Sequence, residues 1–236
     1  MELNGSIAAR LSRPGGGLLL DLDGTLVQSE AVHQRALRDY FVARGWQVAD
    51  DVVREFSGRR AREVFRVLDG PWTGEDPAAV AEDVLEVLRG MAVRPEPVPG
   101  ATRLLAACAT IGLPMAVVTS AQREWVAAAL ELLGAAEFGV RTVTAEDCTH
   151  GKPDPEPFRR GAELLGLDPS GLVAVEDSPA GIASACAAGV GYVIGLTTSR
   201  PAHALRAAGA RETSADLTAL TTTVERQALH RGTASM

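Results

Sequence analysis

The chain has 236 residues, of which 46% are hydrophobic and 22% charged, and its formal net charge is −7. A chain of this length and composition can bury a sizeable α/β core with a smaller insertion, so disorder over most of its length is excluded. The negative charge argues against a general nucleic-acid binder, because no basic excess is available to replace the counterions of a phosphate backbone.

The three cysteines, Cys108, Cys148 and Cys186, are widely spaced and odd in number, which fits a reducing compartment better than a disulfide framework. No segment approaches the roughly 18 apolar residues of a membrane span, and residues 1–20 lack the pattern of a secretion signal. We therefore expect a cytoplasmic protein with no membrane partner. The sequence does not indicate an oligomeric state.

Two scarce residue types are informative. Of the 23 basic residues 22 are arginines, and Lys152 is the single lysine. Because an ammonium is a compact point charge and a guanidinium a wide planar fork, we interpret Lys152 as a place where arginine does not serve, and chance usage is the alternative. The three tryptophans, Trp46, Trp72 and Trp125, are too far apart in the sequence to indicate a stacking platform, and we assign them to packing.

The first predicted element is a short strand near the N-terminus. Residues 1–16 show no periodicity and end in proline and glycine, so we expect a flexible or loosely attached start. The three leucines at 18–20 predict a strand buried on both faces. The strand leads into Asp21 and Asp23, and Gly24 permits a sharp turn that brings both carboxylates to one small volume. A polar turn without function is the alternative reading of these residues.

The next part of the chain is expected to be entirely helical. Its helices are expected at 29–44, 50–56, 60–69 and 76–91. No strand-like run occurs between 29 and 94, and the proline-rich stretch at 95–100 cannot continue a helix, so it is interpreted as a return linker. We therefore expect a helical domain at 29–94 inserted into a core made of 1–28 and 95–236.

From residue 101 onward, strands and helices alternate. The strands are expected at 115–119, 140–144, 172–176 and 191–196. The helices are expected at 101–111, 121–133, 155–165 and 179–187. Strands separated by helices indicate βαβ units, a parallel sheet and an α/β fold class. The last twenty residues are expected to form a short helix with a frayed end.

Polar residues follow four of the expected strands. These sets are Asp21 with Asp23, Thr119 with Ser120, Glu146 and Asp147 with the Lys152 loop, and Glu176 with Asp177. Ligands bind outside the carboxyl ends of the strands in an open parallel sheet, and these ends lie at one edge. Strand ends are often polar, but four separate sets at one edge predict a functional site.

Each set supplies a group that phosphoryl transfer requires. Asp21 is the candidate nucleophile, because a carboxylate can form an aspartyl-phosphate. Asp23 is the candidate general acid for the leaving alkoxide and then the general base for water. Lys152 would neutralise the phosphoryl oxygens, to which the Thr119 hydroxyl and the Ser120 amide would donate hydrogen bonds.

A divalent cation is expected beside the nucleophile, because carboxylates at this spacing repel each other without one. Oxygen ligands of this kind suit Mg²⁺. The candidate ligands are Asp21, Asp23, Asp177 and Glu176. Glu176 either binds the ion through water or positions Lys152, and the sequence does not separate these roles.

Four segments resemble, in order and spacing, the four motifs of the haloacid dehalogenase-like hydrolase superfamily. They are DLDGT at 21–25, TS at 119–120, GKPDP at 151–155 and EDSPAGI at 176–182. The resemblance covers residues 18 to about 200 and implies a Rossmann-like core with an α-helical cap inserted after the first strand. Within the superfamily, the chain is most similar to the small sugar- and polyol-phosphate phosphatases close to β-phosphoglucomutase.

Three positions bear on the activity that this resemblance implies. Asp23 counts against carbon–halogen cleavage, because dehalogenases of the superfamily lack this second aspartate. Thr25 favours hydrolysis, because the phosphatases carry Thr where the mutases typically carry Val. Gln28 is a departure, since related phosphatases often have Asp there.

Substrate choice in this group is implied to lie in the cap. The turn at 56–63 clusters three arginines, of which Arg60 and Arg62 are candidates to bind hydroxyls or a second anionic group when the cap closes. Glu30 and His33, on the first cap helix, are candidates to contact the leaving group or Asp23. The alternatives are a solvated helix start for the arginines and a surface or packing role for the histidine.

The expected function is a Mg²⁺-dependent phosphomonoesterase that hydrolyses a small phosphorylated metabolite, a sugar or polyol phosphate, through an aspartyl-phosphate. A phosphosugar mutase of the β-phosphoglucomutase type is the second reading, and a catalytically silent phospho-ligand-binding protein is the third. A hydrolase would release free phosphate, a mutase would form an isomeric phosphate, and a silent protein would do neither. The sequence does not say which ester is used.

Overall fold

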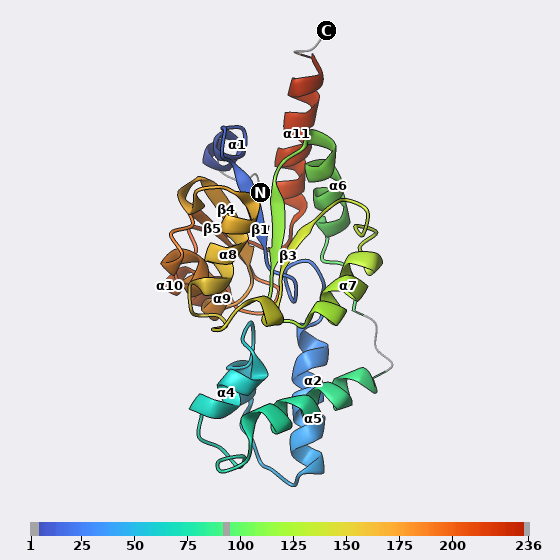
Figure 1. The fold of residues 1–236 in the computed structure, drawn as a ribbon, viewed down its shortest axis with the longest axis vertical. Coiled ribbons are helices and arrows are strands. Elements are labelled where there is room, and N and C mark those ends of the chain that lie inside the picture. Colours follow the sequence, from blue (N-terminus) through green and yellow to red (C-terminus); the bar gives the residue numbers. More distant parts are fainter. Residues whose placement is uncertain (1–4, 92–94, 234–236) are drawn as a thin grey trace.

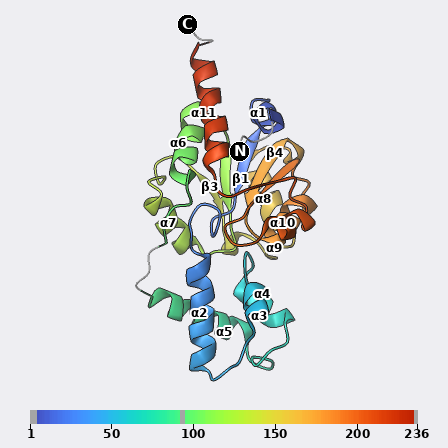
Figure 2. The same cartoon turned by 180° about the vertical axis from the view of Figure 1, so that it is seen from behind.

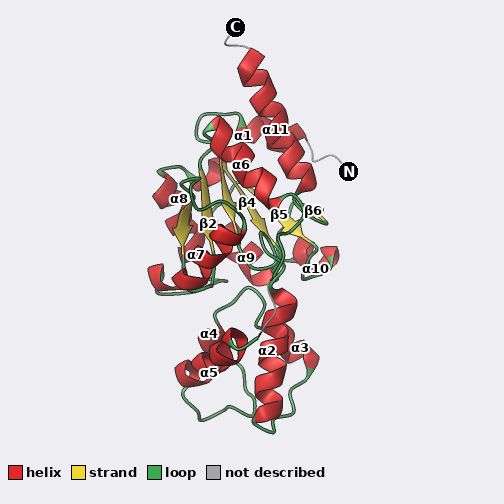
Figure 3. Cartoon of the chain, turned by 90° about the vertical axis from the view of Figure 1, so that its right-hand side faces the viewer, coloured by secondary structure: helices red, strands yellow, loops and turns green. Residues whose placement is uncertain are grey.

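The computed structural model describes residues 5–91 and 95–233, and its central feature is one six-stranded parallel sheet with strand order β3-β2-β1-β4-β5-β6. The strands are β1 Gly17–Leu20, β2 Met115–Val118, β3 Arg141–Val143, β4 Leu172–Glu176, β5 Tyr192–Leu196 and β6 Glu212–Ser214. β1 lies in the middle, paired with β2 on one side and β4 on the other. Figure 3 shows the strands as a fan between helices. The expected α/β fold with a parallel sheet is confirmed.

Both faces of the sheet are covered by helices. Because side chains alternate along a strand, Leu18 and Leu20 belong to one hydrophobic cluster and Leu19 to the other. The first face is covered by α1 Gly5–Leu11, α6 Ala101–Ile111, α7 Arg123–Leu132 and α11 Thr218–Thr233, and the second by α8 Glu156–Leu165, α9 Pro179–Ala187 and α10 Ala202–Ala207. Two 3-10 turns, Ala145–Asp147 and Pro169–Gly171, complete this part.

Four details differ from the sequence-based expectations. The described start of the chain, from residue 5, is not loosely attached, because Ile7 and Leu11 of α1 are buried in the main core, where α1 packs against β4 and α11. Helix α11 is longer than the short helix expected. Helix α10 and strand β6 were not predicted, and β6 reads Glu-Thr-Ser, without an apolar residue to reveal it. Residues 1–4 and 234–236 lie outside the described residues.

Between β1 and α6 the chain forms a helical unit made of α2 Glu30–Ala43, α3 Asp50–Arg54, α4 Ala61–Val67 and α5 Pro77–Arg89. Figures 1 and 2 show this unit below the carboxyl ends of the strands. It has a hydrophobic cluster of its own, separate from the two that flank the sheet. The expected domain boundary at 94 falls beside residues 92–94, which are outside the described residues.

The chain enters and leaves the helical unit through two adjacent segments. The amide of Gln28 donates to the Glu96 carbonyl at 2.7 Å, and the amide of Val98 donates to the Leu26 carbonyl at 2.9 Å. These hydrogen bonds join the two connections to each other. No helix in the described part of the chain has the length and apolar character needed to cross a membrane.

Aromatic rings fill the centre of the helical unit. Trp72 is 2% exposed, stacks on Phe41 with ring centroids 5.5 Å apart and meets Phe65 edge-on at 5.2 Å. Its indole N–H donates to the Leu68 carbonyl at 2.9 Å. The ring therefore buries its apolar surface without leaving its polar atom unpaired.

We predict that Trp72→Ala lowers the free energy of unfolding by about 3–5 kcal/mol, because it leaves a large cavity among packed rings. Urea denaturation followed by circular dichroism measures this change. Val67→Ala is the matched control, since Val67 is 62% exposed in the same unit and its loss should change stability by no more than about 0.5 kcal/mol. Equal effects of the two substitutions would contradict the importance of this cluster.

Candidate active site

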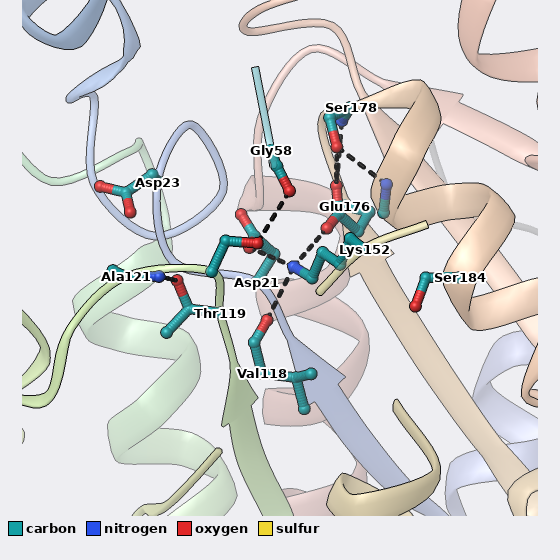
Figure 4. Close-up of polar contacts among 12 residues, drawn as sticks. Asp21, Asp23, Gly58, Val118, Thr119, Ala121, Lys152, Glu176, Ser178 and Ser184 are labelled. Atoms are coloured by element: carbon teal, nitrogen blue, oxygen red, sulfur yellow. Dashed lines mark hydrogen bonds and ion pairs between the residues drawn. The ribbon is translucent and has the colours of Figure 1, made fainter. Parts of the chain in front are cut away.

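The carboxyl ends of β1, β2 and β4 lie side by side and bring distant residues together (Figure 4). Leu20 pairs with Val117 on one side and Val175 on the other, so Asp21, Val118 and Glu176 follow at the same edge. The amide of Asp21 continues the ladder by donating to the Val175 carbonyl at 3.0 Å.

Lys152 lies at the centre of this edge and is fully buried. Its Nζ donates to Asp21 Oδ1 at 2.6 Å, to Glu176 Oε1 at 2.6 Å and to the Val118 carbonyl at 2.9 Å. Burial acts to lower the pKa of Lys152, but the carboxylates of Asp21 and Glu176 outweigh burial and raise that pKa above its usual value. An ammonium has three N–H donors and all are used, whereas a guanidinium has five and would leave some unpaired.

Glu176 is held by both of its oxygens. Oε1 accepts from Lys152, and Oε2 accepts from the amides of Asp177 and Ser178 at 3.0 Å and from the Ser178 hydroxyl at 2.9 Å. The positioning of Lys152 by Glu176 is therefore seen directly in the structure. A role for Glu176 at a metal stays a prediction.

The carboxylates around Lys152 form a group suited to a hard cation. Asp21, Glu176 and Asp177 each offer an oxygen within 4.8 Å of the others. Asp21 Oδ2 and Asp177 Oδ1 are buried and have no hydrogen-bond partner among the described residues. Two such oxygens fit the coordination of Mg²⁺, which takes few protein carboxylates and keeps its other positions for water and phosphate.

The pKa values of these carboxylates also indicate a cation site. Burial raises the pKa of Asp21 to about 8, despite the opposing effect of Lys152. Burial, followed by the charges of Asp21 and Glu176, raises the pKa of Asp177 well above its usual range. One ammonium does not balance three buried carboxylates, so a bound cation would stabilise their ionised forms.

Gly24 lets the turn after β1 approach Asp177 closely. Its φ is +80°, and a Cβ built there would lie 1.8 Å from Asp177 Oδ2. That oxygen also accepts from the Ser199 hydroxyl. Glycine is required at this position both by the backbone conformation and by the space available.

Asp23 lies apart from the Lys152 group, as Figure 4 shows. Its Oδ1 accepts from the Ser29 hydroxyl at 2.5 Å and from the Trp125 indole N–H at 2.9 Å, and His33 Nε2 lies 3.9 Å away. His33 therefore lies on the same side as Asp23, and its role toward Asp23 or the leaving group stays a prediction. Trp125 was assigned to packing alone, and that assignment was incomplete because its indole also contacts the candidate acid–base residue. The signal in the sequence that could have indicated this contact was the position of Trp125 in the first turn of the helix that follows β2.

The second polar set lies between the sheet and the helical unit. Thr119 Oγ1 accepts from the Ala121 amide at 3.0 Å, which leaves its hydroxyl proton available to a ligand. The Ser120 hydroxyl donates to the Gly58 carbonyl at 2.9 Å. Gly58 has φ +71°, and a Cβ there would lie 2.1 Å from the Ser178 hydroxyl oxygen, so this turn packs directly on the site.

Arg60, a candidate substrate residue, is buried and bound by protein groups. Its Nη1 contacts Glu63 Oε1 at 3.2 Å and the Thr149 carbonyl at 3.4 Å. Glu63 Oε1 also accepts from the Gly151 amide at 3.0 Å, so this pair ties α4 to the loop that carries Lys152. Sequence reasoning missed Glu63, although its spacing of three residues from Arg60 is typical of a helical ion pair. Arg62 is exposed on α4.

The remaining candidates divide between the site and other contacts. Glu30 Oε1 accepts from Gln34 Nε2 at 3.0 Å and from the Ser57 hydroxyl, and the charge of Glu30 contributes to the raised pKa of Asp177. Glu146 and Asp147 contact Arg123. Glu146 Oε1 accepts from the Arg123 amide at 3.0 Å, and Asp147 Oδ1 accepts from the Arg123 guanidinium at 2.7 Å. These two acidic residues of the 3-10 turn therefore bind the start of α7 and are not part of the Lys152 group.

Comparisons with known proteins identify the family. A family model described as haloacid dehalogenase-like hydrolase matches residues 18–194. Validoxylamine A 7'-phosphate phosphatase of Streptomyces hygroscopicus subsp. limoneus is 37% identical over 191 residues, which are 79% of this chain and 88% of the relative. Hexitol phosphatase A of Escherichia coli K12 is 35% identical over 176 residues, covering 73% of this chain and 79% of the relative.

Solved structures agree with these matches. CbbY from Rhodobacter sphaeroides in complex with phosphate is 25% identical, with a TM-score of 0.70 over 87% of this chain and 97% of that one. A hydrolase from Pseudomonas syringae, at 21% identity, shares the fold with a TM-score of 0.79 over 89% and 98% of the two chains. The resemblance seen in the four motifs is thereby confirmed, and the chain belongs to the haloacid dehalogenase-like hydrolase family.

Proposed function

We propose that this chain is a Mg²⁺-dependent phosphomonoesterase that hydrolyses a small sugar or polyol phosphate through an aspartyl-phosphate on Asp21. The observation that carries the proposal is the state of the Asp21 carboxylate. Its Oδ1 is bound by Lys152, while its Oδ2 is buried without a partner in the described structure, beside an equally unpartnered Asp177 oxygen. Two relatives, one named a validoxylamine A 7'-phosphate phosphatase and the other a hexitol phosphatase, support the substrate class.

The residues around Asp21 can carry out both halves of this reaction. An Asp21 oxygen attacks phosphorus while the ester P–O bond breaks and Asp23 gives its proton to the departing alkoxide oxygen. Asp23 then takes a proton from water, whose oxygen attacks phosphorus and releases inorganic phosphate from Asp21. The Thr119 hydroxyl and the Ser120 amide donate hydrogen bonds to the phosphoryl oxygens, and Lys152, whose three donors are held by protein groups, acts on them through its positive charge.

The metal belongs to the same proposal. Asp21 and Asp177 would hold Mg²⁺, with Asp23 and Glu176 as further candidate ligands. When bound, the ion supplies positive charge that screens the carboxylates from the anionic ester. The two unpartnered carboxylate oxygens support this assignment.

The helical unit at 29–94 is proposed to act as a cap over a catalytic core made of 1–28 and 95–236. Two contacts support this role, since the Ser120 hydroxyl meets the Gly58 carbonyl and Arg200 Nη2 donates to the Arg54 carbonyl at 2.6 Å. The substrate would be enclosed between the two. We also propose a cytoplasmic location, which is supported by the three free cysteines, Cys108, Cys148 and Cys186.

We predict that Asp21→Asn lowers kcat by at least about a thousandfold, because the amide cannot serve as the nucleophile. Phosphate release is measured over three- to seven-carbon sugar and polyol phosphates with Mg²⁺. Asp39→Asn, on an exposed side chain of α2, is the control and should keep wild-type rates. Turnover retained by Asp21→Asn, or an isomeric phosphate as the product, would contradict the proposal.

We predict that Mg²⁺ raises the melting temperature of the wild-type protein, because it balances the buried carboxylates. Asp177→Asn should remove this response, whereas Asp39→Asn should keep it. Thermal unfolding with and without Mg²⁺ measures the shift, and chelation should abolish phosphate release until Mg²⁺ is restored. If Mg²⁺ does not change the melting temperature of the wild-type protein, this metal site is contradicted.

We predict that Arg60→Ala lowers kcat by the same factor on all esters, because Arg60 binds Glu63 and the loop that carries Lys152 and therefore supports the site whatever the ester. The expected loss is about tenfold, the effect of one charged hydrogen bond. Arg62→Ala is the matched variant, and a substrate-binding role for Arg62 predicts that it changes the order of preference among the esters. A changed order in Arg60→Ala would return Arg60 to the substrate-binding residues.

A further inference from the structure

We propose that Trp125 is a positioning residue for the acid–base carboxylate Asp23. The inference rests on the proposed function and extends it, since it gives a role to a side chain outside the four motifs. It begins from one contact between residues far apart in the sequence. The indole N–H of Trp125 donates to Asp23 Oδ1 at 2.9 Å.

The position of Trp125 makes this hydrogen bond a fixed one. Trp125 lies in the first turn of α7, which starts shortly after β2 ends, and its half-buried ring packs against the main hydrophobic cluster. A tryptophan side chain has one donor and no acceptor, so its N–H must be aimed at a specific oxygen to be satisfied. Here that oxygen belongs to the Asp23 carboxyl group, and the hydrogen bond strengthens when Asp23 gives up its proton, because hydrogen bonds to charged acceptors are stronger than those to neutral ones.

Asp23 is held from two directions by donors that share one oxygen. The Ser29 hydroxyl, at the residue before α2, donates to Oδ1 at 2.5 Å, and Trp125 donates to the same Oδ1 from the sheet core. Among the described residues, Oδ2 receives no hydrogen bond. The pair of donors therefore selects Oδ2 as the oxygen free to exchange a proton with the ester oxygen and then with water.

The two hydrogen-bond donors to Asp23 belong to different parts of the fold. Ser29 belongs to the segment that enters the helical unit, whereas Trp125 belongs to a helix of the sheet core. Among the hydrogen bonds of the described residues, that of the indole is therefore the one that ties the carboxylate of Asp23 to a helix of the sheet core. Loss of the indole N–H would leave the Ser29 hydroxyl of the entry segment as the remaining hydrogen-bond donor to the Asp23 carboxylate in the described structure.

A positioning role makes a specific prediction about leaving groups. An alkoxide is a poor leaving group and needs the proton that Asp23 supplies, whereas p-nitrophenolate departs without one. Misplacing Asp23 should therefore slow the cleavage of an alkyl phosphate and leave the cleavage of p-nitrophenyl phosphate nearly unchanged. A loss of packing would slow both esters to the same degree.

The test compares kcat/KM for glucitol 6-phosphate and p-nitrophenyl phosphate, because kcat/KM reports the steps up to transfer of the phosphoryl group. Trp125→Phe keeps an aromatic ring and removes the donor. We expect a loss of about tenfold on the alkyl ester and less than about twofold on the aryl ester. Trp46→Phe is the control, because Trp46 is a half-buried tryptophan of the helical unit, and it should leave kcat/KM unchanged for both esters.

A double variant makes the assignment sharper. Asp23→Asn alone should show a larger selective loss on the alkyl ester, and adding Trp125→Phe should increase that selectivity no further, because both act through one carboxylate. Equal losses on both esters in Trp125→Phe would overturn the inference, as would an additive double variant. If Asp23→Asn itself shows no selectivity, the acid–base role of Asp23 fails, and the proposed mechanism fails with it.

Discussion

The buried ammonium of Lys152 is the interaction on which the site depends. It joins the ends of three neighbouring strands through Asp21, the Val118 carbonyl and Glu176. Burying such a charge without partners would cost far more than a folded domain can supply, so the carboxylates must be present. Their number exceeds what one ammonium balances, and this excess leaves the Asp177 and Asp21 oxygens that suit a cation.

The sequence was sufficient to predict this edge because its signals are local. An apolar run marks a buried strand, the residues after it mark its end, and parallel strands place those ends together. Lys152 was singled out by composition alone, and its full burial agrees with that inference. The contact between Trp125 and Asp23 joins residues 102 positions apart and depends on how α7 is rotated about its axis, which no local pattern encodes.

Packing decides the elements that the sequence did not reveal. Helix α1 has seven residues, too few for a clear period, yet Ile7 and Leu11 are fully enclosed by the main core. Strand β6 has no apolar residue and exists because its backbone pairs with β5. Arg60 is similar, since a cluster of arginines in a turn indicates solvent or ligand, and only the tertiary fold brings Glu63 and the Lys152 loop to it.

The helical unit and the sheet core meet through contacts of a different kind from those inside each part. Each part has its own hydrophobic cluster, whereas Ser120 with Gly58, Arg60 with Thr149 and Glu63 with Gly151 are polar contacts. A hydrogen bond adds only about 0.5–1.5 kcal/mol net, while a buried aromatic side chain adds several times more. Stability is therefore supplied within each part. The proposed catalytic residues lie at the edge of the sheet core where it meets the helical unit through these polar contacts, so access to them can change without unfolding either core.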